Sequence, residues 1–121
     1  MIRNADAKPL VQLAAEGRDL AASTRDGKAS SVEVTGVTFT ITNLGANDID
    51  GFTPIINPPQ VGILKVGRVL EMTVISDDQI GKGTTMCLSL TFDHRIGDGA
   101  PVAEFLQTVK GLQEDPWWIV G

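Results

Sequence analysis

This sequence of 121 residues lacks several features that mark whole classes of protein. Cys87 is its only cysteine, so no disulfide bond can form within the chain. No apolar run is long enough to span a membrane, and the first residues lack the basic-then-apolar pattern of a signal peptide. We therefore expect a soluble protein without a disulfide framework or a membrane anchor, located in the cytoplasm.

Positive charge and metal ligands are also scarce. Lys and Arg together number 10 against 15 Asp and Glu, the net charge is −5, and the basic residues are scattered singly. This distribution offers no basic stripe for nucleic acid. One histidine, one cysteine and dispersed carboxylates match none of the usual ligand spacings, so we expect no metal site. The remaining composition, 42% hydrophobic and 21% charged, is typical of one globular domain.

The first half of the sequence predicts one helix, one strand and a long loop. Residues 9–25 repeat apolar side chains at three-and-four spacing behind a proline, a pattern typical of a helix. Residues 37–42 alternate apolar side chains with threonine and predict a half-buried strand with one hydroxyl face. Residues 43–59 are too rich in Asn, Gly, Asp and Pro for a helix, and both a functional and a purely structural loop remain open there.

The second half predicts three strands and a helix. Residues 61–67 and 69–75 are expected to form strands, the first so apolar that both of its faces should be covered. Residues 77–83 predict a turn, and residues 84–93 alternate as the next strand. Asp98 is expected to cap a helix that runs to about residue 112 with an apolar stripe.

His94 is the only histidine and lies where the strand of residues 84–93 ends and a Gly-Asp-Gly turn begins. An imidazole takes and returns a proton near neutral pH, so a general base at this position is one interpretation. A structural or surface histidine is the other. Cys87 lies within an apolar run and is expected to be buried and inert, because a thiolate acting with His94 would need side chains from opposite faces of one strand to meet.

Trp117 and Trp118 are adjacent near the end of the sequence, in the strongly apolar stretch 116–120. Two neighbouring tryptophans need a surface on which to lie, since exposed apolar patches usually mark an interface or a dock on the same chain. Contact within an oligomer and docking on the same chain both remain open.

One motif and three further segments resemble a known family. The sequence DHRIGDG (residues 93–99) looks like the DHRxxDG signature of the dihydrolipoamide acyltransferases, the core components of 2-oxo acid dehydrogenase complexes, and is related to the HxxxDG motif of chloramphenicol acetyltransferase. The segments IRNAD (2–6), FTITNLG (39–45) and IINPPQ (55–60) resemble other parts of the same family, in the same order and at similar spacing. The resemblance covers nearly the whole chain.

The resemblance implies an α/β fold, with a mixed β-sheet flanked by helices as in chloramphenicol acetyltransferase, present here as a half-domain. Residues 1–121 would be the C-terminal half of the catalytic domain, while the lipoyl domains, the peripheral-subunit-binding domain and the N-terminal catalytic half would lie outside them. Met1 falls where the family sequence would continue, which suggests an artificial boundary, a proteolytic product or an internal start. A half-domain is expected to self-associate or to need partner chains, because it leaves apolar faces and strand edges uncovered.

The resemblance also assigns roles to individual residues. His94 would be the general base that takes the proton from the thiol of coenzyme A or dihydrolipoamide. Thr42 matches the family residue whose hydroxyl donates a hydrogen bond to the negatively charged tetrahedral intermediate. Asp98 would hold the histidine loop through a salt bridge or hydrogen bonds.

Four further residues would support the motif. Asp93 and Arg95 are expected to orient it, Gly99 completes it, and Asn57 would help two prolines to shape a loop near the active-site channel. The polar segment 46–51 departs from the small apolar and aromatic residues of many relatives, which puts only local packing in doubt. No residue that contacts coenzyme A is assigned.

The implied activity moves an acyl group between dihydrolipoamide and coenzyme A, with both as substrates, the lipoyl group carried on another domain and no metal. An acetyl group is favoured and a branched-chain one remains possible, since residues 43–45 and 49–50 resemble the pyruvate branch more than the succinyl one. Family active sites form between neighbouring subunits of a homotrimer that joins other 2-oxo acid dehydrogenase complex subunits, so the chain alone should be inactive. A non-catalytic scaffold that assembles through Trp117 and Trp118, and a module that only binds coenzyme A, are the alternatives.

Overall fold

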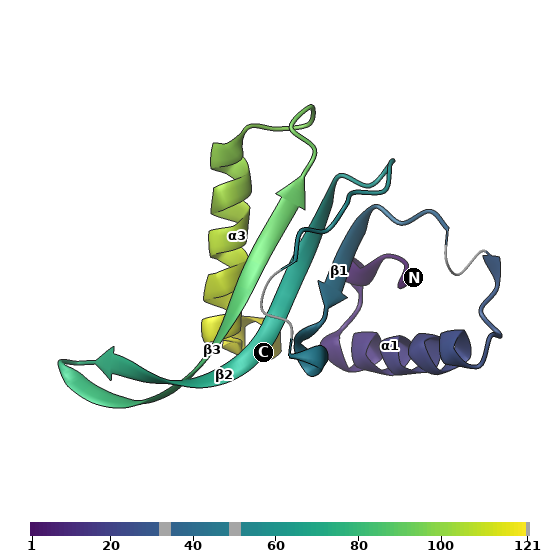
Figure 1. The fold of residues 1–121 in the computed structure, drawn as a ribbon. Coiled ribbons are helices and arrows are strands. Elements are labelled where there is room, and N and C mark those ends of the chain that lie inside the picture. The colour runs from purple at the N-terminus through teal and green to yellow at the C-terminus, as the bar shows by residue number, and fades with distance from the viewer. Residues whose placement is uncertain (32–34, 49–51, 121) are drawn as a thin grey trace. The chain divides into compact units, whose positions relative to one another are not determined.

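The computed structural model describes residues 1–31, 35–48 and 52–120. The chain divides into two compact units, one of Met1–Val37 with Leu112–Gly121 and the other of Thr38–Gly111. The second unit carries all the residues for which the sequence predicts a catalytic role (Figure 1).

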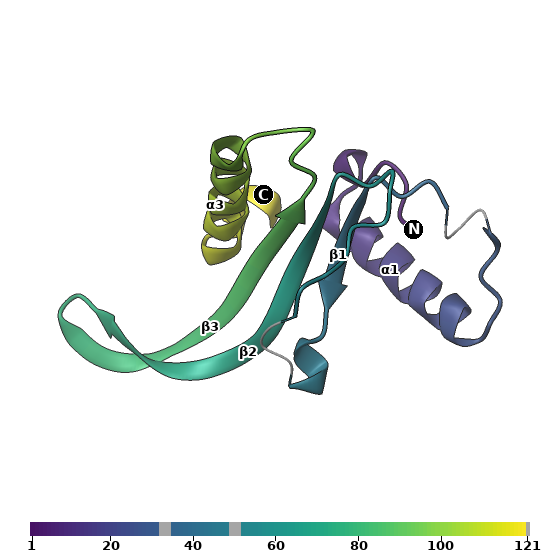
Figure 2. The same ribbon diagram turned by 45° about the horizontal axis from the view of Figure 1, so that its top comes forward.

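A three-stranded mixed sheet lies in the second unit. The mixed sheet agrees with what the family resemblance implies, whereas the sequence predicts four separate strands. Its strands are β1 (Phe39–Asn43), β2 (Gly62–Ser76) and β3 (Gln79–Phe92), in the order β1-β2-β3. β1 is parallel to β2, and β3 is antiparallel to β2. The helix α3 (Gly99–Glu114) follows β3 and lies alongside the sheet in both views (Figures 1 and 2).

The two faces of this sheet differ in chemistry. Side chains of residues paired across neighbouring strands point to the same face, so Phe39, Gly62 and Phe92 share one face. On that apolar face the ring of Phe39 meets the ring of Phe105 on α3 edge-on, with centroids 6.1 Å apart. α3 therefore covers an apolar side of the sheet through the stripe that the sequence predicts for it.

Residues 52–60 run across the opposite, hydroxyl-bearing face. The Thr40 hydroxyl donates a hydrogen bond to the Gln60 side chain, and the Lys65 ammonium donates one to the Phe52 carbonyl. Thr40 is consequently half-buried, whereas Ile41 on the other face is 66% exposed. The strand expected at 37–42 thus begins two residues later, and its hydroxyl face is the better covered one.

β2 holds the core, in agreement with the prediction that its first part is covered on both faces. Residues 62–65 are all buried, and Ile63 and Leu64 are each 6% exposed. The predicted break between two strands at residue 68 was wrong. A register shift between Val66 and Val69 absorbs the irregularity as a bulge, so a single strand continues through it.

β2 and β3 extend past β1 as a two-stranded hairpin, visible in Figure 1 as the long ribbon that leaves the sheet. The prediction of a turn over residues 77–83 was wrong, because Asp77 and Asp78 alone make it, with φ of 51° and 59°. A two-residue hairpin turn of type I′ needs positive φ at both positions, and aspartate tolerates positive φ better than most residues. Gly81 and Gly83 therefore lie within β3.

The first unit contains a short helical turn η1 (Ala5–Ala7), the helix α1 (Leu10–Arg25) and the terminal helix α4 (Trp117–Val120). The helix predicted over residues 9–25 is confirmed, with Pro9 as its N-cap. Trp117 and Trp118 are 76% and 82% exposed, so their own unit does not cover them. Within the described residues, no helix combines the length and apolar character that crossing a membrane requires.

Candidate active site

Thr42 lies one residue before the end of β1 and is half-buried. The chain leaves the strand through a tight turn in which the Asn43 side chain accepts a hydrogen bond from the Gly45 amide at 2.9 Å, leading into η2 (Gly45–Asn47). A side chain at position 45 would place its Cβ 2.8 Å from the Cα of Arg68 in the bulge of β2. The absence of a side chain at Gly45 therefore lets η2, directly after β1, lie against the bulge of β2.

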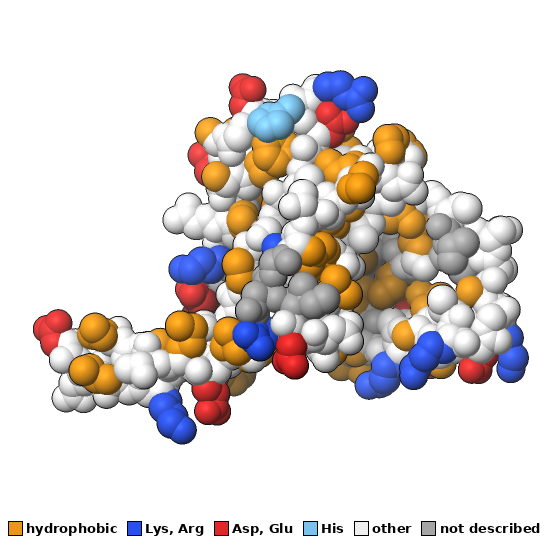
Figure 3. Space-filling model, in the orientation of Figure 1, with side chains coloured by type: hydrophobic (Ala, Val, Ile, Leu, Met, Phe, Trp, Pro, Cys, Tyr) orange, Lys and Arg blue, Asp and Glu red, His pale blue; other side chains and the backbone are white. Residues whose placement is uncertain are grey.

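His94 follows the end of β3 in a hydrogen-bonded turn. The Asp93 amide donates to the Val61 carbonyl at 3.0 Å, and the Ile96 amide donates to the Asp93 carbonyl at 3.0 Å. The imidazole lies against the ring of Phe92, with centroids 4.4 Å apart, and is otherwise exposed, as the pale blue side chain in Figure 3 shows. The turn and this aromatic contact hold the imidazole at the surface, where a thiol can reach it.

Asp93 and Arg95 form a close ion pair on either side of His94. The Arg95 side chain donates to both carboxylate oxygens of Asp93 at 2.5 to 3.0 Å, and the Arg95 amide donates to Asp93 Oδ1 at 2.9 Å. These bonds from Arg95 lower the pKa of Asp93 from 3.8 to about 2 and raise the pKa of Arg95. The pair thus remains charged at every pH at which an imidazole exchanges protons.

Asp98 and Gly99 lie where the sequence places them, at the start of α3. In the described part of the chain Asp98 is exposed and makes no hydrogen bond or ion pair, so the expected link between Asp98 and the histidine loop is not formed in this structure. Asn57 is also exposed, and its carbonyl accepts the Gln60 amide at 3.1 Å around the cis bond between Pro58 and Pro59.

Thr42 and His94 lie towards opposite ends of the three-stranded part of the sheet. Thr42 pairs with Lys65, and Lys65 pairs with Ser89, which precedes His94 by five residues along β3. At about 3.3 Å per residue and about 4.8 Å per strand, this register separates Thr42 from His94 by roughly 15 to 20 Å. Figure 1 shows the same relation, since β1 and β3 end at opposite edges. One chain therefore does not bring both side chains to one substrate atom.

An apolar groove of about 370 Å³ lies beside the histidine turn, between α3 and the sheet. Its lining includes Phe39, Phe92, Phe105 and, from the motif, Asp93 and Gly97. A second hollow of about 470 Å³ lies at the other end of the sheet, lined by residues that include Asn43 and Gly45. Neither Thr42 nor His94 lines these hollows, although the residue next to each in the chain does.

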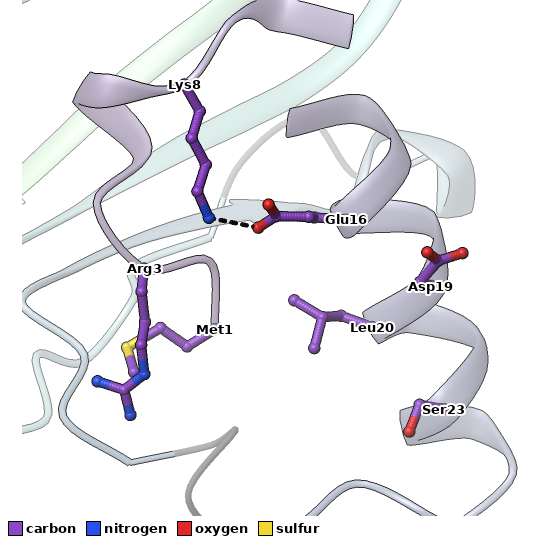
Figure 4. Close-up of a pocket in the computed structure, with 7 residues that line it drawn as sticks. All are labelled: Met1, Arg3, Lys8, Glu16, Asp19, Leu20 and Ser23. Carbon is purple, nitrogen blue, oxygen red and sulfur yellow. Dashed lines mark hydrogen bonds and ion pairs between the residues drawn. The ribbon is translucent and has the colours of Figure 1, made fainter. Parts of the chain in front are cut away.

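The first unit has a separate hollow of about 500 Å³, shown in Figure 4. On one side of it Lys8 donates to Glu16 at 2.6 Å, and this bond, aided by one from Gln12, lowers the pKa of Glu16. Arg3 and Asp19 line it as well. Of the charged residues that line it, Arg3 belongs to the segment 2–6 that carries part of the family resemblance, and none belongs to the motif around His94.

Two expectations about single residues need correction or addition. Cys87, predicted to be buried, is exposed, because it lies opposite the bulge of β2, where strand pairing is interrupted. Lys65 was not predicted as a site residue, yet it is buried beside Thr42. A charged residue in the apolar run of residues 61–66 was the signal for it. Ile49, Asp50 and Gly51, which bear on the predicted acyl preference and on the polar segment, lie outside the described residues.

Comparison with known proteins agrees with the motif and the fold. A dihydrolipoyllysine-residue acetyltransferase component of the acetoin cleaving system of Bacillus subtilis (strain 168) is 46% identical over 116 residues, which cover 96% of this chain and 29% of that protein. The chain thus spans less than a third of the length of this relative.

Two solved structures share the fold, each with a TM-score of 0.90, 38% identity, and coverage of 99% of this chain and 49% of theirs. One is Azotobacter vinelandii dihydrolipoamide acetyltransferase, studied for the catalytic roles of a serine, a histidine and an asparagine, and the other is the cubic core of the pyruvate dehydrogenase multienzyme complex. The sequence profile of the 2-oxoacid dehydrogenases acyltransferase (catalytic domain) family matches residues 1–120. The chain, an α/β structure with a mixed sheet, therefore belongs to this acyltransferase family.

Proposed function

We propose that this chain is the C-terminal half of the catalytic domain of a dihydrolipoamide acetyltransferase, which moves an acetyl group between dihydrolipoamide and coenzyme A. One observation carries the proposal. In the Azotobacter vinelandii enzyme the histidine follows the serine, and the asparagine follows the histidine, at the same intervals as His94 follows Thr42 and Asp98 follows His94. Thr42 keeps a hydroxyl at the first position, and Asp98 keeps a side-chain oxygen at the third.

The reaction follows from what these groups can do. The imidazole of His94 takes the proton from the thiol of coenzyme A, and the resulting thiolate attacks the carbonyl carbon of the acetyl thioester. The electron pair of the C=O bond moves to the oxygen, and the Thr42 hydroxyl donates a hydrogen bond to this oxyanion. When the intermediate collapses, the C–S bond to dihydrolipoamide breaks, and the leaving thiolate takes the proton back from His94.

A shared site between chains is part of the proposal. Because one chain separates Thr42 from His94 by roughly 15 to 20 Å, a single substrate carbonyl and thiol need His94 of one chain and Thr42 of a neighbour. We propose a homotrimer as the unit in which this happens, built into a larger core with other 2-oxo acid dehydrogenase complex subunits. The exposed Trp117 and Trp118 favour a role of α4 in such assembly.

The acetyl group is the proposed acyl group because the relatives named above are acetyltransferases. The lipoyl group would be carried on a domain outside these residues and would enter as a substrate, as would coenzyme A. We also propose that the protein is located in the cytoplasm, as expected from the sequence.

The test uses a hybrid enzyme, in which the 116 matching residues of the Bacillus subtilis acetyltransferase are exchanged for those of this chain. We expect the hybrid to transfer acetyl groups between acetyl-CoA and dihydrolipoamide. His94→Ala should lower kcat by about 100- to 10,000-fold, the usual contribution of a general base. Thr42→Ala should lower kcat by about 100- to 1,000-fold, as the loss of one oxyanion donor does.

Thr108→Ala is the matched control, since this exposed threonine on α3 bonds only to its own helix, through the Glu104 carbonyl. It should leave kcat unchanged. The proposal is contradicted if the hybrid assembles like its parent and transfers no acetyl group, or if His94→Ala retains full activity. The isolated 121-residue chain should be inactive in the same assay. Robust turnover by it, lost on His94→Ala, would contradict this inactivity while supporting the chemistry.

A further inference from the structure

Lys65 is a buried charge on β2, the central strand of the sheet. It lies on β2 between Leu64 and Val66, and its residue is only 7% exposed. Lysine is rarely buried to this extent unless its charge is compensated, because removing an ammonium group from water is costly. The positive charge of Lys65 therefore requires a compensating partner.

Among the described residues, the Lys65 ammonium has only partners that carry no full negative charge. The ammonium donates one hydrogen bond to the Phe52 carbonyl at 3.1 Å, and it lies 5.2 Å from the centroid of the Phe52 ring. No carboxylate pairs with it in residues 1–31, 35–48 and 52–120. An ammonium carries three donors, so the described residues leave this positive charge without a fixed anion.

The strand register places this charge beside Thr42. Thr42 and Lys65 are direct neighbours across the parallel pair, so their side chains project from the same face with backbones about 4.8 Å apart. Ser89 is the next residue in the same row. A negative charge that forms at the Thr42 hydroxyl therefore forms next to a desolvated cation, where electrostatic attraction is stronger than in water.

We propose that Lys65 stabilises the oxyanion of the acetyl transfer together with Thr42, an inference that rests on the proposed function. As the thiolate forms its bond to the carbonyl carbon, the π electron pair moves to the oxygen, which then carries the negative charge that Lys65 faces. On collapse the pair returns to the C=O bond, and the charge leaves with the departing thiolate. The anion exists only near the transition state, so a charge that no described carboxylate neutralises accelerates the reaction without tightening substrate binding.

The test replaces Lys65 in the hybrid enzyme with an uncharged side chain of similar length, Lys65→Met, and with a charged one, Lys65→Arg. Lys65→Met should lower kcat roughly 30- to 100-fold, as the loss of a nearby charge predicts, and leave KM for both thiols unchanged. Its unfolding temperature should be equal to or above that of the parent, because an apolar residue replaces a buried charge. Lys65→Arg should recover most of the activity.

Lys82→Met is the matched control, because the side chain of Lys82 is 90% exposed on the same sheet. It should change neither kcat nor stability. A role of Lys65 limited to holding residues 52–60 predicts instead a lower unfolding temperature and raised KM values in Lys65→Met, and that result would overturn the proposal. Unchanged kcat in Lys65→Met, in a hybrid that His94→Ala inactivates, would also overturn it while leaving the acetyltransferase function intact.

Discussion

Two inactive variants of the hybrid enzyme, Thr42→Ala and His94→Ala, should together form an active enzyme. The reason is the topology of the sheet. β1 and β3 run in opposite directions, so Thr42 and His94 of one chain lie far apart and would belong to two different active sites. Roughly 15 to 20 Å separates them, whereas proton transfer and oxyanion binding both need contacts of about 3 Å.

The size of the recovery follows from this arrangement. In a closed ring each site takes Thr42 from one chain and His94 from the next. When equal amounts of the two variants assemble at random, a site is intact only if its first chain carries the His94→Ala change and its second the Thr42→Ala change. This combination makes up about a quarter of the sites. Activity should therefore rise from at most about 1% in either variant alone to about 25% of the parent value.

The assay is acetyl transfer from acetyl-CoA to dihydrolipoamide, measured on co-expressed variants and on the two proteins purified separately and mixed without exchange of subunits. Only the co-expressed sample should recover. Equal sedimentation of all samples ensures that assembly is unchanged. Recovery no greater than the sum of the two variants would refute the shared site, as would full activity of a hybrid held as a monomer.

Three further outcomes are expected. Arg95→Gln should raise the pKa of Asp93 from about 2 towards 3.8, and a carbon NMR titration that shows an unmoved midpoint would contradict the pairing. Because the pKa of Asp93 is lower in the folded chain than in the unfolded one, the stability from this pair is present above about pH 4 and is lost as the pH falls towards 2. Gly45→Ala should destabilise the chain by about 1 to 3 kcal/mol relative to Gly81→Ala in urea unfolding. A Cβ at position 45 would lie 2.8 Å from backbone atoms, whereas a Cβ at position 81 has nothing within 4 Å, and equal stabilities of the two variants would refute this clash. Replacing both tryptophans of α4 with alanine should reduce the sedimentation coefficient without altering the circular dichroism spectrum, and unchanged sedimentation would exclude α4 from assembly.

Features that depend on local spacing were accessible from the sequence. The apolar period of α1 and of α3, the alternation in β1 and the turn that begins at Asp93 all follow from side chains close together in the chain. The hairpin was predicted less well. Two glycines in residues 77–83 suggested a long turn, whereas paired aspartates with positive φ close it in two residues and return Gly81 and Gly83 to β3.

The sequence by itself determined the family and the candidate chemistry of this protein, because the motif around His94 and the hydroxyl of Thr42 are patterns of residue type and interval. Only the tertiary structure decided how these groups are distributed. Burial of Lys65 and exposure of Cys87 depend on what covers each face of the sheet, which no local pattern encodes. The separation of Thr42 from His94 depends on strand direction. Because β3 runs antiparallel to β1 and β2, its C-terminal end, which His94 follows, lies beside the N-terminal end of β1, whereas Thr42 lies near the C-terminal end of β1.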